Sequence, residues 1–93
     1  MHYVYIMANW SNTTLYIGFT SDLVRRVYEH REGLGSGFSK KYATTKLVYY
    51  ESGGGRDGVL AREKELKKWN RFKKERLILS ENPFWEDLYD RIV

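Results

Sequence analysis

The sequence predicts an α+β domain in which helices flank a three-stranded sheet, in the order ββαβααα. Three short segments rich in Tyr, Val, Ile and Leu have the composition of strands. Between and after them, apolar side chains recur at helical spacing behind capping residues. The chain has 93 residues, which is the size of one domain, so residues 1–93 are assigned to a single domain.

Residues 3–8 and 14–19 predict a β-hairpin, because the two segments are separated by a short polar turn at 9–12. If this turn is symmetric, Ala8 lies opposite Thr13 and the pairing continues back along both strands.

The same register places Tyr5 opposite Tyr16. Side chains alternate along a strand, so Tyr3, Tyr5, Tyr16 and Gly18 share one face of the sheet. Gly18 leaves that face bare beside Tyr16, which is typical of a close approach by another group.

Capping residues at 20–22 predict a helix over residues 22–31, and Gly33 ends it. A flexible glycine turn at 35–37 and a short helical turn at 38–42 follow. Residues 46–51 then predict the third strand.

Three helices complete the predicted order. The first runs from Asp57 or Gly58 to about Asn70, and the second covers residues 72–79. The pair Asn82–Pro83 predicts an N-cap followed by proline at the first helical position. The last helix would carry apolar side chains at helical spacing, namely Phe84, Trp85, Leu88, Tyr89 and Ile92.

Composition narrows the functional classes. The chain has no cysteine, which excludes disulfide frameworks, thiolate metal sites and thiol enzymes. It carries no apolar run of membrane-spanning length and no basic leader, so we expect a soluble cytoplasmic protein. Its formal net charge is +4, and Lys and Arg outnumber Glu in residues 62–76. A polyanionic partner is one interpretation of that segment, and a solvated helix face is the other.

Glu63 falls within an apolar helical stripe. At 100° per residue it lies on the same side of its helix as Val59 and Leu66, whereas Glu65 points to solvent. An inward carboxylate is costly unless it is paired or binds a cation. It is therefore either a buried salt bridge to an arginine from elsewhere, or a metal ligand or acid–base group.

Arg26 and His30 stand one turn apart beside the apolar stripe formed by Leu23 and Val27. An arginine that snorkels past the core and a satisfied core histidine would explain either residue alone. Taken with two tyrosines and an inward carboxylate, they form a chemical set. Arginine can clamp a phosphate, a carboxylate can hold Mg²⁺ and a phenol can transfer a proton, which suits phosphodiester hydrolysis.

Two triplets and one helix carry a resemblance to a known family. Residues 3–5 read Tyr-Val-Tyr, and residues 16–18 read Tyr-Ile-Gly about ten positions later. Residues 61–69 place Glu63 in a helix that resembles a metal-binding helix. In these features the chain resembles the GIY-YIG endonucleases. Its tail at 82–89 is similar to that of their small stand-alone bacterial branch.

The resemblance implies an antiparallel sheet and an endonuclease that hydrolyses DNA phosphodiester bonds with low sequence specificity, in DNA repair or recombination. One Mg²⁺ or Mn²⁺ ion would be bound by Glu63. Tyr5 or Tyr16 would deprotonate or position the attacking water, Arg26 would neutralise the scissile phosphate and His30 would assist. We expect these five side chains to converge on one concave pocket that solvent can reach.

Other residues are candidates for phosphate binding. Phe19 stands where the excision-repair members of the family carry a basic residue, and Lys40 or Lys41 could supply that cation. Lys67 and Lys68 belong to the basic segment and would contact phosphates in a sequence-independent way. DNA is the expected partner, with RNA still open, no membrane, and the oligomeric state unassigned. Two alternatives remain, a catalytically silent nucleic-acid-binding module and a protein-interaction adaptor.

Overall fold

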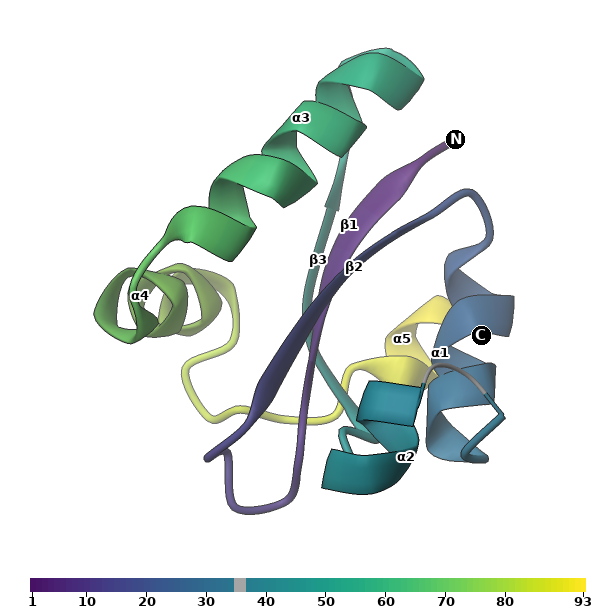
Figure 1. The fold of residues 1–93 in the computed structure, drawn as a ribbon, viewed down its shortest axis with the longest axis vertical. Coiled ribbons are helices and arrows are strands. Elements are labelled where there is room, and N and C mark those ends of the chain that lie inside the picture. Colours follow the sequence, from purple (N-terminus) through teal and green to yellow (C-terminus); the bar gives the residue numbers. More distant parts are fainter. Residues whose placement is uncertain (35–36) are drawn as a thin grey trace.

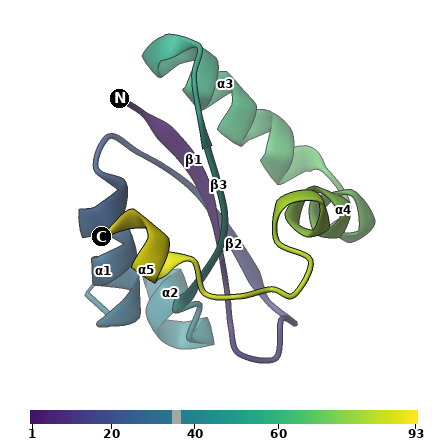
Figure 2. The ribbon, with the colours of Figure 1, turned by 180° about the vertical axis from the view of Figure 1, so that it is seen from behind.

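A computed structural model of the chain describes residues 1–34 and 37–93. Figure 1 shows three layers, with the sheet between α3 and α4 on one side and α1, α2 and α5 on the other, and Figure 2 shows the same arrangement from behind. The elements are β1 (Tyr3–Ala8), β2 (Leu15–Thr20), α1 (Leu23–Arg31), α2 (Gly37–Tyr42), β3 (Lys46–Ser52), α3 (Gly55–Lys68), α4 (Arg71–Glu81) and α5 (Tyr89–Ile92). The predicted α+β class and element order are confirmed, with α2 as the short helical turn. The turn residues 35–36 lie outside the described residues.

The sheet is antiparallel throughout and has the strand order β2-β1-β3, so β1 is central and β2 is an edge strand. Tyr5 lies opposite Gly18 and Ala8 opposite Leu15, so the predicted hairpin register is wrong by two residues. Because the slip is even, every side chain keeps its predicted face.

The turn explains the register. Asn9 remains in the ladder, where its backbone N–H donates to the Thr14 carbonyl at 3.3 Å. The Asn9 side-chain oxygen accepts from the backbone N–H groups of Thr13 at 2.9 Å and Thr14 at 3.1 Å. Asn12 adopts the left-handed conformation, with φ 59°, which asparagine tolerates. The loop therefore begins one residue later than a symmetric turn at 9–12 would have it.

Each face of the sheet has its own apolar core. Between the sheet and the layer of α3 and α4, the buried cluster is Val4, Ile6, Ala8, Ile17, Val48, Tyr49, Val59, Leu66 and Ile78. On the layer of α1 and α5, it is Tyr5, Met7, Leu23, Val27, Leu47 and Leu88. A 93-residue chain thus fixes helices on both faces of one small sheet, and α1 and α3, which carry Arg26, His30 and Glu63, are anchored by buried side chains.

The helix termini follow the predicted caps at the start of the chain. The Asp22 side chain accepts a hydrogen bond from the Arg25 backbone N–H at 3.1 Å, and Gly33 follows α1 with φ 71°. Further along, α3 stops at Lys68 because Trp69 is extended and Asn70 caps α4. None of the helices described in residues 1–34 and 37–93 has the length and apolar character needed to cross a membrane.

The predicted last helix is wrong. Asn82 ends α4 instead of starting a helix, and its buried side-chain amide donates to the carbonyls of Val48 and Glu86 at 3.0 and 2.9 Å. Its side-chain oxygen accepts from the Glu86 backbone N–H at 3.0 Å. Trp85 then takes a left-handed conformation with φ 55°, and helical structure resumes only at Tyr89. The asparagine stabilises a turn against β3, so it is not available as an N-cap.

Candidate active site

Four of the predicted site residues form a cluster on the α1 side of the sheet: Tyr5 from β1, Tyr16 from β2, and Arg26 and His30 from α1. The Tyr5 hydroxyl and His30 Nε2 share a hydrogen bond of 2.8 Å. The Tyr16 ring lies 4.8 Å from the His30 ring and 6.2 Å from the Tyr5 ring, measured between centroids. We call these four residues the tyrosine–arginine–histidine cluster.

Gly18 makes room for this cluster. Tyr5 faces Gly18 across the hairpin, and its ring folds over the glycine. A Cβ atom at Gly18 would overlap the Tyr5 hydroxyl and would lie 2.7 Å from Cε1 of that ring. The close approach predicted at Gly18 is therefore made by Tyr5, and the glycine lets the phenol reach His30.

The cluster has a buried part and an accessible part. Tyr5 and His30 are fully buried, whereas Tyr16 is half-buried and 32% of the Arg26 side chain is exposed. A substrate can therefore contact Arg26 and Tyr16 directly. Tyr5 and His30 lie beneath them and can act only through these neighbours.

Burial sets the protonation of the inner pair. It raises the pKa of the Tyr5 hydroxyl well above its usual value, although hydrogen bonding to Arg26 opposes the rise. Burial and the nearby Arg26 charge lower the pKa of His30 to about 4. At neutral pH both groups are uncharged. The pKa of Arg26 is raised, chiefly by hydrogen bonding to Tyr5, so the guanidinium is the fixed positive charge of the cluster.

Two neighbours of the cluster were not predicted from the sequence. Glu29 accepts from Arg26 Nη1 at 3.2 Å and pairs with Arg25 Nε at 3.5 Å. Its spacing from Arg26 on one helix is a signal that could have predicted the pair. Phe38, on α2, places its ring 5.5 Å from the Tyr16 ring. No spacing pattern connects Phe38 to Tyr16, because only the tertiary fold brings α2 to the hairpin.

Glu63 lies on the other layer of the molecule, so the five predicted side chains do not converge on one pocket as expected. Its helix, α3, buries Val59 and Leu66 against the face of the sheet opposite to Tyr5. The Glu63 side chain is 11% exposed and its Oε2 pairs with Lys67 Nζ at 2.7 Å. Glu63 thus faces inward as predicted, and its partner is a lysine one turn away on the same helix.

A divalent cation fits this carboxylate in chemical type, since Mg²⁺ prefers hard oxygen ligands. Within the described residues, no three His, Cys, Asp or Glu side chains are grouped as a metal site, so Glu63 does not belong to a site of that kind. Water and phosphate oxygens would fill the rest of the coordination shell. Lys67 would have to leave the carboxylate, which its 54% exposed side chain can do by turning into solvent.

The predicted phosphate-binding lysines are exposed and divide between the two layers. Lys40 and Lys41 lie on α2, near the cluster, whereas Lys67 and Lys68 lie in the last turn of α3. A polyanion that contacts both pairs must therefore pass around the sheet.

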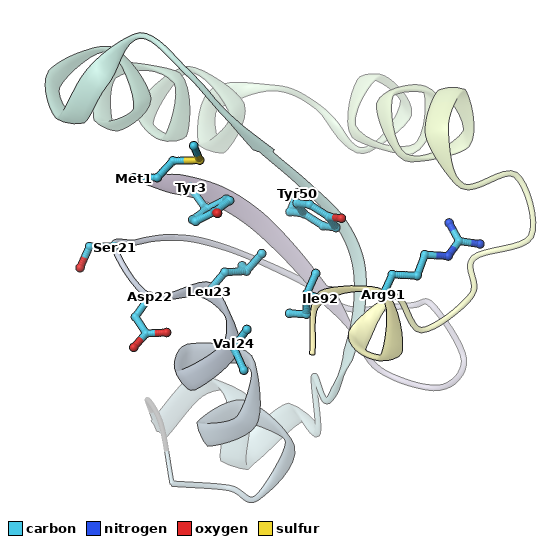
Figure 3. A pocket seen from close by; sticks show the side chains of 9 residues that line it. All are labelled: Met1, Tyr3, Ser21, Asp22, Leu23, Val24, Tyr50, Arg91 and Ile92. Atoms are coloured by element: carbon cyan, nitrogen blue, oxygen red, sulfur yellow. The ribbon is translucent and has the colours of Figure 1, made fainter.

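A hollow of about 450 Å³ lies between the start of α1 and the C-terminal end of the chain. Figure 3 shows the side chains that line it, among them Tyr3, Asp22, Tyr50 and Arg91. The lining includes none of the five predicted catalytic residues. This hollow therefore borders the layer that holds the cluster, but the side chains of the cluster do not line it.

Comparison with known proteins matches the chain to one family model and to several relatives. A family model described as the GIY-YIG catalytic domain matches residues 1–76. The chain is 41% identical over 76 residues to a UPF0213 protein of Haloquadratum walsbyi, covering 82% of this chain and 84% of that protein. It is 40% identical over 83 residues to a UPF0213 protein of Syntrophus aciditrophicus, covering 88% and 93% of the two chains. The solution NMR structure of a UPF0213 protein from Bacillus halodurans has a TM-score of 0.58 and 29% identity, with 92% of this chain and 90% of that chain covered.

Proposed function

Since the chain belongs to the GIY-YIG catalytic domain family, we propose that it is a divalent-metal-dependent endonuclease that cuts DNA with little sequence preference. The family implies a nuclease-type hydrolase and a nucleic-acid substrate. The observation that carries the proposal is the tyrosine–arginine–histidine cluster, in which a guanidinium and a phenol meet solvent above a buried neutral pair. DNA repair or recombination is the setting that this activity would serve.

Arg26 is the proposed phosphate ligand. Its guanidinium is partly exposed and can form two parallel hydrogen bonds to the non-bridging oxygens of a phosphodiester. As water attacks phosphorus and the bond to the leaving sugar oxygen breaks, negative charge grows on these oxygens. A fixed cation at this position stabilises that charge more than it stabilises the ground state.

Tyr16 is the proposed phenol at the attacking water. Of the two tyrosines, it is the one that solvent reaches. Tyr5 keeps its proton because burial raises its pKa, so we assign it and His30 a positioning role. Their hydrogen bond holds in place the two buried side chains that lie beneath Tyr16 and Arg26.

Glu63 is the proposed ligand of the divalent cation, which would supply positive charge at the phosphate. Glu63 and the cluster lie on opposite faces of the sheet, but Tyr16 belongs to β2, an edge strand over which α3 packs. A DNA strand that crosses this edge could contact Tyr16 on one side and a cation at Glu63 on the other. This path would also pass between the two lysine pairs.

The test is nicking of supercoiled plasmid in Mg²⁺ or Mn²⁺. We expect Arg26→Ala to lower the rate by about 10²- to 10³-fold, the usual loss for one electrostatic stabiliser. Arg26→Lys should recover little, because an ammonium does not reproduce the two-pronged contact. Glu63→Gln should abolish metal-dependent cleavage and leave DNA binding in place. Matched controls are Arg25→Ala, at a side chain that is 76% exposed, and Glu65→Gln, at one that is 54% exposed.

Thermal melts of each variant must accompany the assay, because Arg26 and Glu63 border apolar cores. Folded Arg26 and Glu63 variants that still nick DNA at the parent rate would refute the proposal. If the parent binds DNA and never cuts it, the silent binding module is the better description. The pairing of Glu63 with Lys67 and of Arg26 with Glu29 favours that second candidate, because both charges are already neutralised.

A further inference from the structure

A second surface, remote from the tyrosine–arginine–histidine cluster, has the chemistry of a base-binding site. An open groove of about 500 Å³ follows the corner where α3 passes into α4. It lies on the layer of α3 and α4, across the sheet from the cluster. Its lining residues are Trp69, Phe72, Lys73, Arg76, Leu77 and Ser80, and we call it the α3–α4 groove.

Two aromatic rings in this groove carry cations. Phe72 is 65% exposed, and the Arg76 guanidinium lies 5.7 Å from the centre of its ring. The half-buried Trp69 ring has Lys73 Nζ at 5.2 Å. An exposed apolar ring normally costs solubility, and a cation on its face offsets only part of this cost. Aromatic faces beside mobile cations are the combination that binds stacked bases together with their phosphates.

The charges around the groove are available to an anion. Among the ion pairs of the described residues, Lys67 and Arg71 are held by Glu63 and Glu75. Within residues 1–34 and 37–93, no carboxylate pairs with the other cations of the corner. These cations are Lys68, Lys73, Lys74 and Arg76. An unneutralised positive surface around apolar rings is complementary to a polyanion with exposed aromatic faces.

We propose that the α3–α4 groove binds unpaired nucleotides of a nucleic-acid strand, with a base stacked on Phe72 and backbone phosphates held by Lys73 and Arg76. Duplex DNA does not fit this chemistry, because its bases are already stacked and present only phosphates to the cations. The inference deepens the proposed function, since it assigns the substrate a single-stranded portion outside the cutting site. It rests on that proposal only for the nature of the substrate.

The experiment measures binding without cleavage. Fluorescence anisotropy in EDTA would titrate the protein into a labelled oligothymidylate and, separately, into a labelled blunt hairpin duplex. We expect Phe72→Ala to weaken oligothymidylate binding by at least about fivefold, the lower end for one lost stacking partner. Phe72→Trp should bind as tightly as the parent or more tightly. Phe84→Ala is the matched control, since Phe84 is 83% exposed and does not line the groove.

Each outcome decides the inference. A loss confined to oligothymidylate and to Phe72→Ala supports it, and it does so even if the protein never cuts DNA. Equal oligothymidylate affinity in parent and Phe72→Ala overturns it, and so does an equal loss for the duplex. If sedimentation shows a dimer that Phe72→Ala dissociates, the groove is an interface between two copies of the chain and the inference is wrong. Nicking activity that survives a negative binding result would leave the proposed function standing alone.

Discussion

Arg26 is placed between groups that compete for it. On the inner side it faces the Tyr5 phenol, which raises the pKa of the guanidinium, and on the outer side it pairs with the Glu29 carboxylate at 3.2 Å. A phosphate that approaches from solvent meets the outer side, where Glu29 already satisfies one edge of the guanidinium. Glu29 therefore acts as an internal anion that substrate has to displace.

We expect Glu29→Gln to tighten DNA binding by about two- to fivefold, because a partly exposed ion pair of this kind is worth only a few tenths to one kcal/mol. The measurement is anisotropy with labelled duplex in the absence of metal. Glu32→Gln is the control, since it makes the same change of net charge at an exposed residue one turn along. Equal tightening in both variants would mean that net charge alone, and not the contact with Arg26, is responsible.

His30 makes the stability of the domain depend on pH. Its pKa is about 4 in the folded state, against 6.5 for the ordinary side chain. Between these values the unfolded chain binds a proton that the folded chain does not, so the free energy of unfolding falls as pH falls. The loss begins near pH 6.5 and is complete near pH 4, on the order of 3 kcal/mol.

Urea denaturation of the parent and of His30→Gln at pH 7.5, 6, 5 and 4 measures this dependence. The difference in unfolding free energy between the two proteins should shrink toward low pH, because glutamine does not titrate. The carboxylates titrate in both proteins, so they shift both curves of unfolding free energy against pH together. Parallel curves across the whole range would contradict a neutral buried imidazole.

At the scale of elements, the β1–β2 hairpin depends on the space above Gly18. We expect Gly18→Ala to destabilise the fold by about 1–3 kcal/mol, the range for forcing extra volume into a packed core. The displaced Tyr5 ring should also lose its hydrogen bond to His30. Gly58→Ala is the matched control, because a Cβ at that helical position meets no atom within 4 Å outside the neighbouring backbone of its own helix.

The control should be neutral or should stabilise α3 by about 0.5–1 kcal/mol, since alanine replaces glycine inside a helix. Chemical denaturation of both variants makes the comparison. If the two variants are equally stable, the contact between Tyr5 and Gly18 does not constrain the hairpin.

The strands and most helices were predictable because their signals are local. Alternation placed both tyrosines on one face, and helical spacing placed Arg26 and His30 beside a buried stripe. The hairpin register was not predictable from local signals, because it depends on how the Asn9 side chain closes the turn. The last helix failed for a similar reason. Asn82 has the sequence context of an N-cap, but its amide binds a β3 carbonyl 34 residues earlier in the chain.

The site was predictable in its parts and less so in its assembly. Tyr5, Tyr16, Arg26 and His30 meet as their faces require, whereas the layer on which Glu63 lies follows from how α3 crosses the sheet. A helical wheel says which side of a helix is buried. It does not say against which face of a sheet that side packs, so the relation of Glu63 to the cluster needed the tertiary structure.

At the scale of the whole molecule, cations lie on both layers and the formal net charge is +4. We expect DNA affinity to be weak and to fall steeply with salt, because phosphate contacts release counterions. If DNA crosses the β2 edge, neutralising either lysine pair should lower the salt slope by up to about two. The variants are Lys40→Ala with Lys41→Ala, and Lys67→Ala with Lys68→Ala.

Affinity should fall similarly for unrelated DNA sequences, since these contacts do not read bases. Anisotropy titrations at several salt concentrations give the slope. Tight binding to one short sequence, or affinity that is indifferent to salt, would contradict the interpretation.

The segment after residue 76, which comprises the second half of α4 and the chain that follows it, determines where this domain can be joined to another protein. The family model ends at residue 76, yet Ile78 fills the core on one side of the sheet and Leu88 fills the core on the other. The Leu88 backbone N–H also donates to the Leu47 carbonyl at 2.8 Å. The region that the family model matches and the folding unit therefore have different boundaries. A chimera that joins this domain to a DNA-recognition module should place the junction after Ile92, because a junction at residue 76 would remove part of both cores.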